Sequence, residues 1–239
     1  MSNWKERTVL LFGKEKIKKL ENSHVLIVGL GGVGAHAAEQ LVRAGIGAMT
    51  IVDGDRIHLS NLNRQLLALK STQNHDKALL MRDRLLDINP LLKLTVINEY
   101  ITEERIKEIL DYNYNYIVDA IDTLSPKVDL ISLSLQKGLQ VISSMGAGGK
   151  TDASLVQIAD ISKTYNDNLA RMIRKRLHRK GIYSGIKVVF SPEKIDPSAI
   201  ILTDNELNKK TTVGTISYMP AIFGNFIASV VIRDLLNIK

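Results

Sequence analysis

Apolar residues gather into short runs that alternate with helical patterns over the first half of the chain. The runs are nearly continuous in apolar character, as in strands buried on both faces of a parallel sheet. They lie at residues 24–30, 48–53, 92–99, 114–122 and 139–145. Helical patterns lie between them, at residues 32–44, 75–89, 102–110 and 125–138. This alternation predicts an α/β fold with a Rossmann-like, doubly wound and mostly parallel sheet.

The pattern changes after about residue 150. Apolar runs at 155–161 and 186–191 flank a very basic helical segment, and a polar stretch from 192 to 212 predicts a loop. A long apolar helix then follows from Pro220. There is no internal repeat and no low-complexity linker.

These features predict a single domain over residues 1–239. Its first part, about residues 1–150, carries the regular alternation of strands and helices. The remainder, about residues 151–239, is an elaborated C-terminal portion that we expect to contact the substrate or a second subunit.

Composition narrows the classes of function. The chain has 239 residues, 45% of them hydrophobic and 24% charged, as is usual for a globular protein. It contains no cysteine, which excludes disulfides, thiolate zinc sites and a cysteine nucleophile within it. No apolar stretch reaches the roughly 18 to 20 residues that span a bilayer, so we expect no membrane association and a cytoplasmic protein. The net charge of +7 is by itself weak evidence for a polyanionic partner.

A glycine cluster follows the first predicted strand. Gly29, Gly31 and Gly34 satisfy G-x-G-x-x-G, Gly32 adds a fourth glycine, and Asp53 closes the next strand. Glycines let the backbone approach a phosphate, and the helix amino end attracts its charge. The Asp53 carboxylate can accept hydrogen bonds from ribose hydroxyls. The cluster predicts a nucleotide site, but by itself it fits NAD as well as ATP.

The residues that follow favour ATP. Several polar side chains come directly after Asp53, namely Asp55, Asn61, Asn63, Arg64 and Gln65. Arg64 can bind phosphate oxygens in bidentate fashion, and Lys77 opens a helix where its charge opposes the helix dipole. Such cations suit a terminal triphosphate, which NAD lacks. Taken alone, Lys77 would be a solvated surface lysine, and Asp122 at the end of the fourth strand would be a helix N-cap.

Together these motifs resemble the ThiF/MoeB/HesA family of ubiquitin-activating-like adenylyltransferases, which transfer AMP from ATP to a carboxylate. The shared elements are G-x-G-G-x-G, D-x-D, N-x-N-R-Q, the lysine, and the D-x-x-D that ends at Asp122. The resemblance implies that Asp53 holds ribose, that Asn61, Arg64 and Lys77 hold the triphosphate, and that Asp122 binds Mg²⁺. The implied cofactor-binding set is Gly29, Gly31, Gly32, Gly34, Asp53, Asp55, Asn61, Asn63, Arg64, Gln65 and Lys77.

The resemblance also implies catalytic roles for Arg7, Arg64, Lys77 and Asp122. Arg7, in "ERTVLLFG", matches an arginine that family members lend to the ATP site of a partner subunit. An isolated arginine near an N-terminus would usually face solvent. In this context it predicts a homodimer in which Arg7 is contributed in trans.

Two branches of the family use this chemistry. One activates a ubiquitin-like sulfur-carrier protein and often bears paired C-x-x-C zinc motifs, which this chain lacks. The other branch is the tRNA threonylcarbamoyladenosine dehydratases. Its members have sequence segments similar to "RTVLLFG", "SSMGAGGK" and "GTISYMPAIFGNF" in this chain. This branch implies adenylation of the threonylcarbamoyl carboxylate on adenosine at tRNA position 37, followed by ring closure that expels AMP. Sulfur-relay proteins are possible partners on this resemblance.

Because the second nucleophile belongs to the substrate, a chain without cysteine can perform this reaction by positioning and charge stabilisation. Two other classes stay open as alternatives: an NAD(P)-dependent oxidoreductase and a nucleotide-sensing scaffold without catalysis. Arg64, Lys77 and Asp122 argue against both.

The basic helical segment at 168–181 suits an RNA substrate. Its candidate RNA-binding residues are Arg171, Arg174, Lys175, Arg176, Arg179 and Lys180. A solvated helix face is the alternative interpretation. "SMGAGGK", residues 144–150, follows the fifth strand, where it is either a substrate loop or a plain turn. Leu67 stands where the branch commonly has histidine, so no role for that histidine can be carried over.

Overall fold

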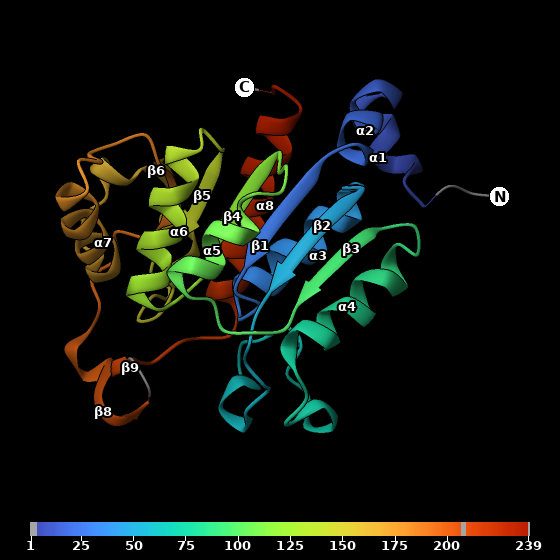
Figure 1. Cartoon of the computed structure of the whole chain (residues 1–239). Coiled ribbons are helices and arrows are strands. Elements are labelled where there is room, and N and C mark those ends of the chain that lie inside the picture. Colours follow the sequence, from blue (N-terminus) through green and yellow to red (C-terminus); the bar gives the residue numbers. More distant parts are fainter. Residues whose placement is uncertain (1–3, 207–208, 239) are drawn as a thin grey trace.

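The computed structural model describes residues 4–206 and 209–238, and its main feature is a seven-stranded sheet (Figure 1). The strand order is β3-β2-β1-β4-β5-β7-β6, and every neighbouring pair is parallel except β6 with β7. The strands are β1 (His24–Val28), β2 (Ala48–Val52), β3 (Lys93–Ile97), β4 (Tyr116–Asp119), β5 (Val141–Ser144), β6 (Gln157–Asp160) and β7 (Lys187–Phe190). The predicted doubly wound, mostly parallel fold is confirmed.

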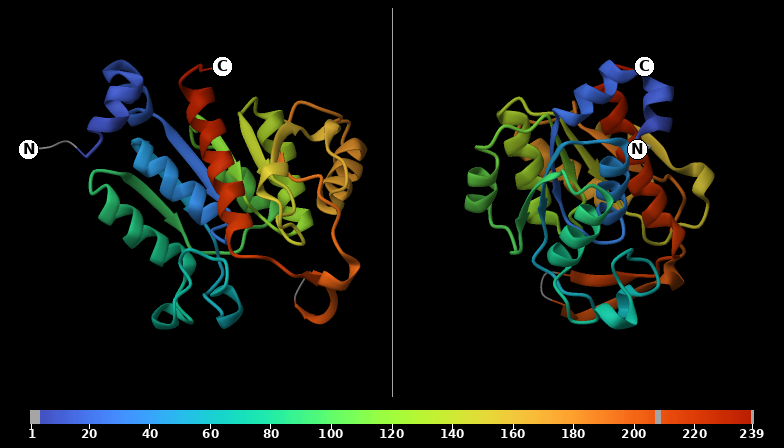
Figure 2. Two further views of the ribbon diagram at one scale, coloured as in Figure 1. Left: turned by 180° about the vertical axis from the view of Figure 1, so that it is seen from behind. Right: turned by 90° about the vertical axis from the view of Figure 1, so that its right-hand side faces the viewer.

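Helices cover both faces of the sheet, which explains the apolar character of its central strands (Figure 2). On β1, Val25 and Ile27 join one core cluster, whereas Leu26 and Val28 join another. The first cluster includes side chains of α2 (Lys14–Glu21), α3 (Gly34–Ala44), α4 (Lys77–Ile88) and α8 (Tyr218–Leu235). The second includes side chains of α5 (Glu103–Ile109) and α6 (Leu124–Gln136). A third cluster packs α7 (Asn168–Arg179) against α6.

The chain reverses its direction of winding between β1 and β4, and ligands of such sheets bind at the carboxyl ends of the strands there. Gly29 follows β1 and Ala120 follows β4, so both loops lie at this carboxyl edge. The helices α1 (Glu6–Phe12) and α2 precede β1 and lie at the opposite, amino edge (Figure 1).

The predicted loop at 192–212 is wrong, because it contains a hairpin of β8 (Ile200–Glu206) and β9 (Lys209–Val213). The two strands form a separate sheet on the carboxyl-edge side of the molecule (Figure 1). Charged and polar residues dominate the sequence of this stretch and conceal the strand pattern. Short 3₁₀ turns complete the described chain at Leu59–Asn61, Lys70–Thr72, Ala153–Leu155, Ile161–Lys163 and Pro197–Ala199.

Among the described helices, none is both long and apolar enough to cross a membrane. The longest of them, α8, begins at Tyr218, so Pro220 lies in its first turn, where a proline is tolerated. The helix packs against α3, and nine of its residues are buried.

Candidate functional site

The four glycines after β1 have different structural roles. Gly29 has a φ of 92°, and a Cβ there would lie 2.7 Å from the Ala120 carbonyl oxygen. A Cβ on Gly34 would lie only 1.8 Å from the Gly29 carbonyl oxygen. At Gly31, by contrast, the nearest atom to a Cβ would be Gln65 Nε2 at 3.8 Å. Gly29 and Gly34 therefore allow the loop to close, and Gly31 leaves its backbone open to a ligand.

The C-terminal helix supports this loop. A Cβ on Gly32 would lie 2.8 Å from Pro220 Cβ, in the first turn of α8. One turn further along α8, a Cβ on Gly224 would lie 2.5 Å from the Val33 carbonyl oxygen. The glycine loop is therefore enclosed by a helix that lies far from it in sequence.

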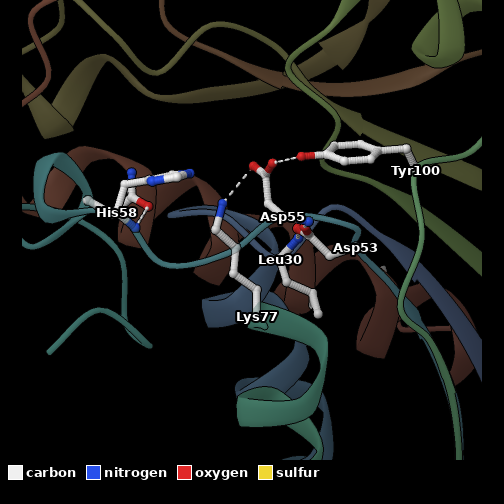
Figure 3. Close-up of polar contacts among 7 residues, drawn as sticks. Leu30, Asp53, Asp55, His58, Lys77 and Tyr100 are labelled. Atoms are coloured by element: carbon white, nitrogen blue, oxygen red, sulfur yellow. Dashed lines mark hydrogen bonds and ion pairs between the residues drawn. The ribbon is translucent and has the colours of Figure 1, made fainter. Parts of the chain in front are cut away.

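Asp53 joins the end of β2 to the glycine loop (Figure 3). Its Oδ2 accepts a hydrogen bond from Leu30 N at 2.6 Å, and its Oδ1 accepts one from Asp55 N at 2.7 Å. Burial raises the pKa of Asp53, although the nearby charge of Lys77 opposes that shift. Each carboxylate oxygen has a second lone pair, so the bonds that position the loop leave capacity for ribose hydroxyls.

Lys77 is held by Asp55, which is also bound by Tyr100 (Figure 3). Lys77 Nζ donates to Asp55 Oδ2 at 2.8 Å, and the Tyr100 hydroxyl donates to Asp55 Oδ1. This hydrogen bond to Asp55 is the main reason that the pKa of Tyr100 is raised to about 12. Lys77 is only 3% exposed, so its interpretation as a solvated surface lysine is wrong.

Tyr100 was not predicted as a site residue, but Gly54 indicates that the backbone of Tyr100 passes close to it. A Cβ on Gly54 would lie 2.4 Å from Tyr100 N, so a glycine is needed where the loop after β3 crosses the one after β2. The approach places the Tyr100 hydroxyl beside the second acid of D-x-D.

The N-x-N-R-Q segment is held by its own hydrogen bonds. Buried Asn61 accepts from His58 N at 3.0 Å through Oδ1, and Asn63 Nδ2 donates to Thr215 O at 2.9 Å. Arg64 Nη1 donates to Ser60 O at 2.8 Å and to Asn63 Oδ1 at 2.9 Å. Asn61 and Asn63 therefore fix the segment, while the Arg64 guanidinium retains further donors for a ligand.

Gln65 provides the clearest sign that a polar ligand belongs beside the glycine loop. Its Oε1 is the only buried side-chain polar atom without a hydrogen-bond partner among residues 4–206 and 209–238. Leaving such an atom unsatisfied costs about 1–3 kcal/mol. Because Gln65 Nε2 would be the nearest atom to a Cβ on Gly31, the unsatisfied amide lies where the loop is open.

The two acids of D-x-x-D lie in different environments. Asp119 is completely buried, with Lys127 Nζ at 2.8 Å and Ser143 Oγ at 2.6 Å from its Oδ2. Burial raises its pKa and the Lys127 charge opposes that shift. Asp122 is exposed on the loop after β4, at the carboxyl edge. Thr123 is the N-cap residue of α6, so the N-cap interpretation of Asp122 is wrong.

No group of three or more acidic or histidine side chains forms a ready-made metal site within the described residues. Mg²⁺ commonly binds through one or two carboxylates together with substrate phosphates. The exposed carboxylate of Asp122 fits this mode because its loop lies at the same edge as the glycine loop.

The 144–150 loop is fixed by two carboxylates of the C-terminal portion that sequence reasoning missed. Asp167 Oδ2 accepts from Gly146 N at 3.1 Å. Glu193 Oε2 accepts from Thr151 N at 2.8 Å and from Asp152 N at 2.9 Å. Lys150 is buried, which lowers its pKa, and it donates to the Glu193 carbonyl oxygen.

The basic residues of the 168–181 segment fall into two groups. Arg174 turns inward and donates to Thr164 Oγ1, and Arg176 Nη1 donates to Ser125 Oγ at 2.8 Å. Lys180 Nζ lies 3.1 Å from Asp129 Oδ1. Three exposed residues make no side-chain hydrogen bond or ion pair with the described part of the chain, namely Arg171, Lys175 and Arg179.

Arg7 lies apart from every other predicted site residue. It is an exposed residue of α1, at the amino edge of the sheet, whereas the glycine loop lies at the carboxyl edge (Figure 1). The five residues of β1 separate the two edges by roughly 16 Å of strand.

Comparison with known proteins places this geometry in context. The model of the ThiF family matches residues 5–239. The tRNA threonylcarbamoyladenosine dehydratase of Bacillus subtilis is 38% identical over 96% of this chain and 93% of its own length. The Escherichia coli enzyme of that name is 36% identical over 80% of this chain and 75% of its own. The crystal structure of the E. coli dehydratase in complex with ATP superposes with a TM-score of 0.87 at 32% identity, covering 98% of this chain and 95% of that one.

Proposed function

The chain belongs to the ThiF family, and we propose that it catalyses the ATP-dependent dehydration of N6-threonylcarbamoyladenosine at position 37 of tRNA. One observation carries the proposal: the B. subtilis dehydratase matches 96% of the chain, from the glycine loop through the C-terminal portion. The fit of the fold to an ATP-bound relative supports ATP as the nucleotide.

Three features of the carboxyl edge suit ATP. The open backbone at Gly31 can approach the phosphates, and the unsatisfied Gln65 amide oxygen can accept a hydrogen bond from a hydroxyl or amino group of the nucleoside. Asp53 has lone pairs for the ribose. Lys77 and Arg64 supply positive charge for the triphosphate, and Lys77 would be shared between Asp55 and a phosphate.

The reaction proceeds in two steps, adenylation of the carboxylate and then ring closure. A carboxylate oxygen of the threonylcarbamoyl group attacks the α-phosphorus of ATP, and the bond to pyrophosphate breaks. The ureido group of the same nucleoside then attacks the activated carbonyl carbon, the bond to AMP breaks, and a proton leaves the nucleophile. Lys77 and Arg64 stabilise charge on the leaving pyrophosphate, and the loops position the reacting groups.

Mg²⁺ would be held by Asp122 together with phosphate oxygens, and it would neutralise charge on the triphosphate. Asp122 suits this role because it is exposed at the edge where the phosphates would lie, while Asp119 is already occupied by Lys127.

We also propose that Arg7 acts in a homodimer. Its helix, α1, has no buried residue, and its neighbouring leucines Leu10 and Leu11 are 87% and 74% exposed. Two adjacent exposed leucines favour contact with another subunit. Since Arg7 lies at the far edge from its own glycine loop, a second copy is the molecule to which it could contribute.

We infer that the two portions of the chain act as one unit. The contacts of Gly32 with Pro220, Asn63 with Thr215, and Gly146 with Asp167 support this inference. The exposed cations of α7 support a role in RNA contact. A sulfur-relay partner stays a prediction of the resemblance.

The test is to incubate the protein with ATP and tRNA that carries the threonylcarbamoyl group. The tRNA is then digested, and the masses of its nucleosides are measured by mass spectrometry. We expect the modified nucleoside to lose the mass of one water while AMP and pyrophosphate accumulate. Unmodified tRNA is the matched control. Pyrophosphate exchange that depends on a ubiquitin-like protein, with no change in the tRNA, would establish the sulfur-carrier alternative instead.

A further inference from the structure

We propose that the hollow between α6 and α7 binds a backbone phosphate of the RNA, an inference that rests on the proposed function. The hollow has a volume of about 280 Å³. It is lined by three residues of α6 and three from the end of α7, namely Ser125, Val128, Asp129, Arg176, Arg179 and Lys180. Both sets have the spacing i, i+3, i+4, so each helix turns one face toward the hollow.

Two contacts hold the walls together. Arg176 Nη1 donates to Ser125 Oγ at 2.8 Å, and Lys180 Nζ lies 3.1 Å from Asp129 Oδ1. These contacts join the first two turns of α6 to the last turn of α7 (Figure 1). Arg179 lines the same hollow but has no side-chain hydrogen bond or ion pair to the residues that the structure describes. Its guanidinium donors are therefore available to an anion.

The lining of the hollow carries an excess of positive charge, which suits an anion. Its lining contains three cations and only one carboxylate, Asp129. On the adjoining α5, Glu103 and Lys107 pair with each other at 2.8 Å and add no net charge. Arginine and lysine side chains bind phosphate oxygens through charge-assisted hydrogen bonds.

The residues that line the hollow favour binding of a nucleic-acid backbone and not of a free nucleotide. Val128 is its only apolar side chain, and none of its residues is aromatic, so it offers no surface on which a base could stack. Contacts of this kind position a nucleic acid without reading its sequence. Ser125 follows Asp122 by a single helical turn, so a phosphate held here would bring a nearby nucleotide toward the catalytic edge.

The test measures binding of a fluorescent anticodon stem-loop RNA to the full chain over a range of salt concentrations. We expect Arg179→Ala to weaken binding by roughly tenfold or more, the effect of losing one charged hydrogen bond. The slope of log Kd against log salt should fall by about one. Lys18→Ala removes the same charge from α2 at the amino edge and should leave both quantities unchanged.

Binding of ATP to Arg179→Ala should match that of the wild type, because Arg179 lies outside the glycine loop. Equal RNA affinity and equal salt slope for wild type and Arg179→Ala would overturn the phosphate site while tRNA dehydration continued. If inorganic phosphate raised the Tm of the wild type only, with RNA affinity unchanged in the variant, the site would be one for a small anion and the RNA proposal would be wrong. If the wild-type protein bound ATP but neither bound nor modified the tRNA, that result would contradict both the proposed function and this inference.

Discussion

Asp119 and Asp122 are close in sequence, yet Asp119 is buried against a lysine and Asp122 is exposed. A carboxylate inside a parallel sheet must be paired or neutralised, whereas one on the following loop can be used for a ligand. Lys127 pairs with Asp119 inside the sheet, whereas Asp122 is exposed at the carboxyl edge.

Substitutions at these two acids should separate activity from stability. Asp122→Ala should lower kcat by about 100-fold or more, the scale of losing a transition-state charge contact. Its free energy of unfolding should stay within about 0.5 kcal/mol of the wild type, as for other exposed positions. Asp119→Asn should instead cost about 3–5 kcal/mol, because Lys127 would remain buried without its counter-ion. Urea unfolding and single-turnover assays measure both effects, and full activity of Asp122→Ala would refute the metal assignment.

The sequence identified the residues whose chemistry is local, but not the contacts that hold them. The glycines, Asp53 and Asp122 follow predicted strands, so the topology brings them to one edge. Tyr100, Asp167 and Glu193 bind partners that are distant in sequence. The pattern of apolar and polar residues along the chain cannot predict such contacts. Burial of Lys77 has the same origin, because it depends on the loop that carries Asp55.

At the scale of elements, the β1–α3 connection and the first residue of α3 together contain one glycine that is closely packed and one that is open to a ligand. Gly34 is packed against the loop's own backbone, while Gly31 borders open space. The hairpin of β8 and β9 could not be predicted in this way, because its sequence is mostly polar and shows no alternation of apolar residues.

Alanine should have opposite effects at the two glycines. Gly34→Ala should destabilise the fold by about 1–3 kcal/mol or more, because its methyl group overlaps the Gly29 carbonyl oxygen. Gly31→Ala should unfold near the wild-type Tm, yet weaken ATP binding by about tenfold, the effect of losing one charged hydrogen bond. Calorimetry of unfolding and of ATP binding distinguishes them. Wild-type ATP affinity in Gly31→Ala would place the phosphates elsewhere.

The packing of α3 on α4 should depend on pH through Glu39. Burial tends to raise the pKa of this carboxyl, but hydrogen bonds from Arg84 at 2.5 Å and Arg43 at 2.8 Å bring the pKa below its ordinary value. The group therefore contributes stability above pH 4.5 that is lost as the pH falls through its folded-state pKa.

Glu39→Gln tests this contribution. The variant should be less stable than the wild type by about 1 kcal/mol at neutral pH. The difference in stability between the two proteins should shrink as the pH falls through the lowered folded-state pKa of Glu39, because the wild-type side chain is then protonated as well. A constant difference across the acid range would mean that Glu39 acts through packing and not through its charge.

At the scale of the whole molecule, the two edges of the sheet carry different tasks. The carboxyl edge holds the nucleotide loops, and the amino edge carries α1 with its exposed leucines and Arg7 (Figure 1). One chain therefore presents most of a site at one edge and an unused arginine at the other.

Mixing variants should reveal whether Arg7 serves a second copy. Arg7→Ala and Asp122→Ala should each be nearly inactive alone. After the two are mixed and allowed to exchange subunits, about a quarter of the sites should be intact, because each heterodimer combines one wild-type Arg7 with one wild-type Asp122. Recovered turnover in the mixture, absent from either variant, measures this. An Arg7→Ala variant with wild-type activity would remove the in-trans role.

The packing of Pro220 on Gly32, and of Gly224 against Val33, has a consequence for the order of synthesis. A ribosome makes the glycine loop early and α8 late, so the nascent chain carries an unfinished loop while most of the protein is translated. The contacts of the loop with Pro220 and Gly224 can form only after α8 has docked. If the loop binds ATP as proposed, we expect a polypeptide released before α8 is made to bind ATP more weakly than the whole chain.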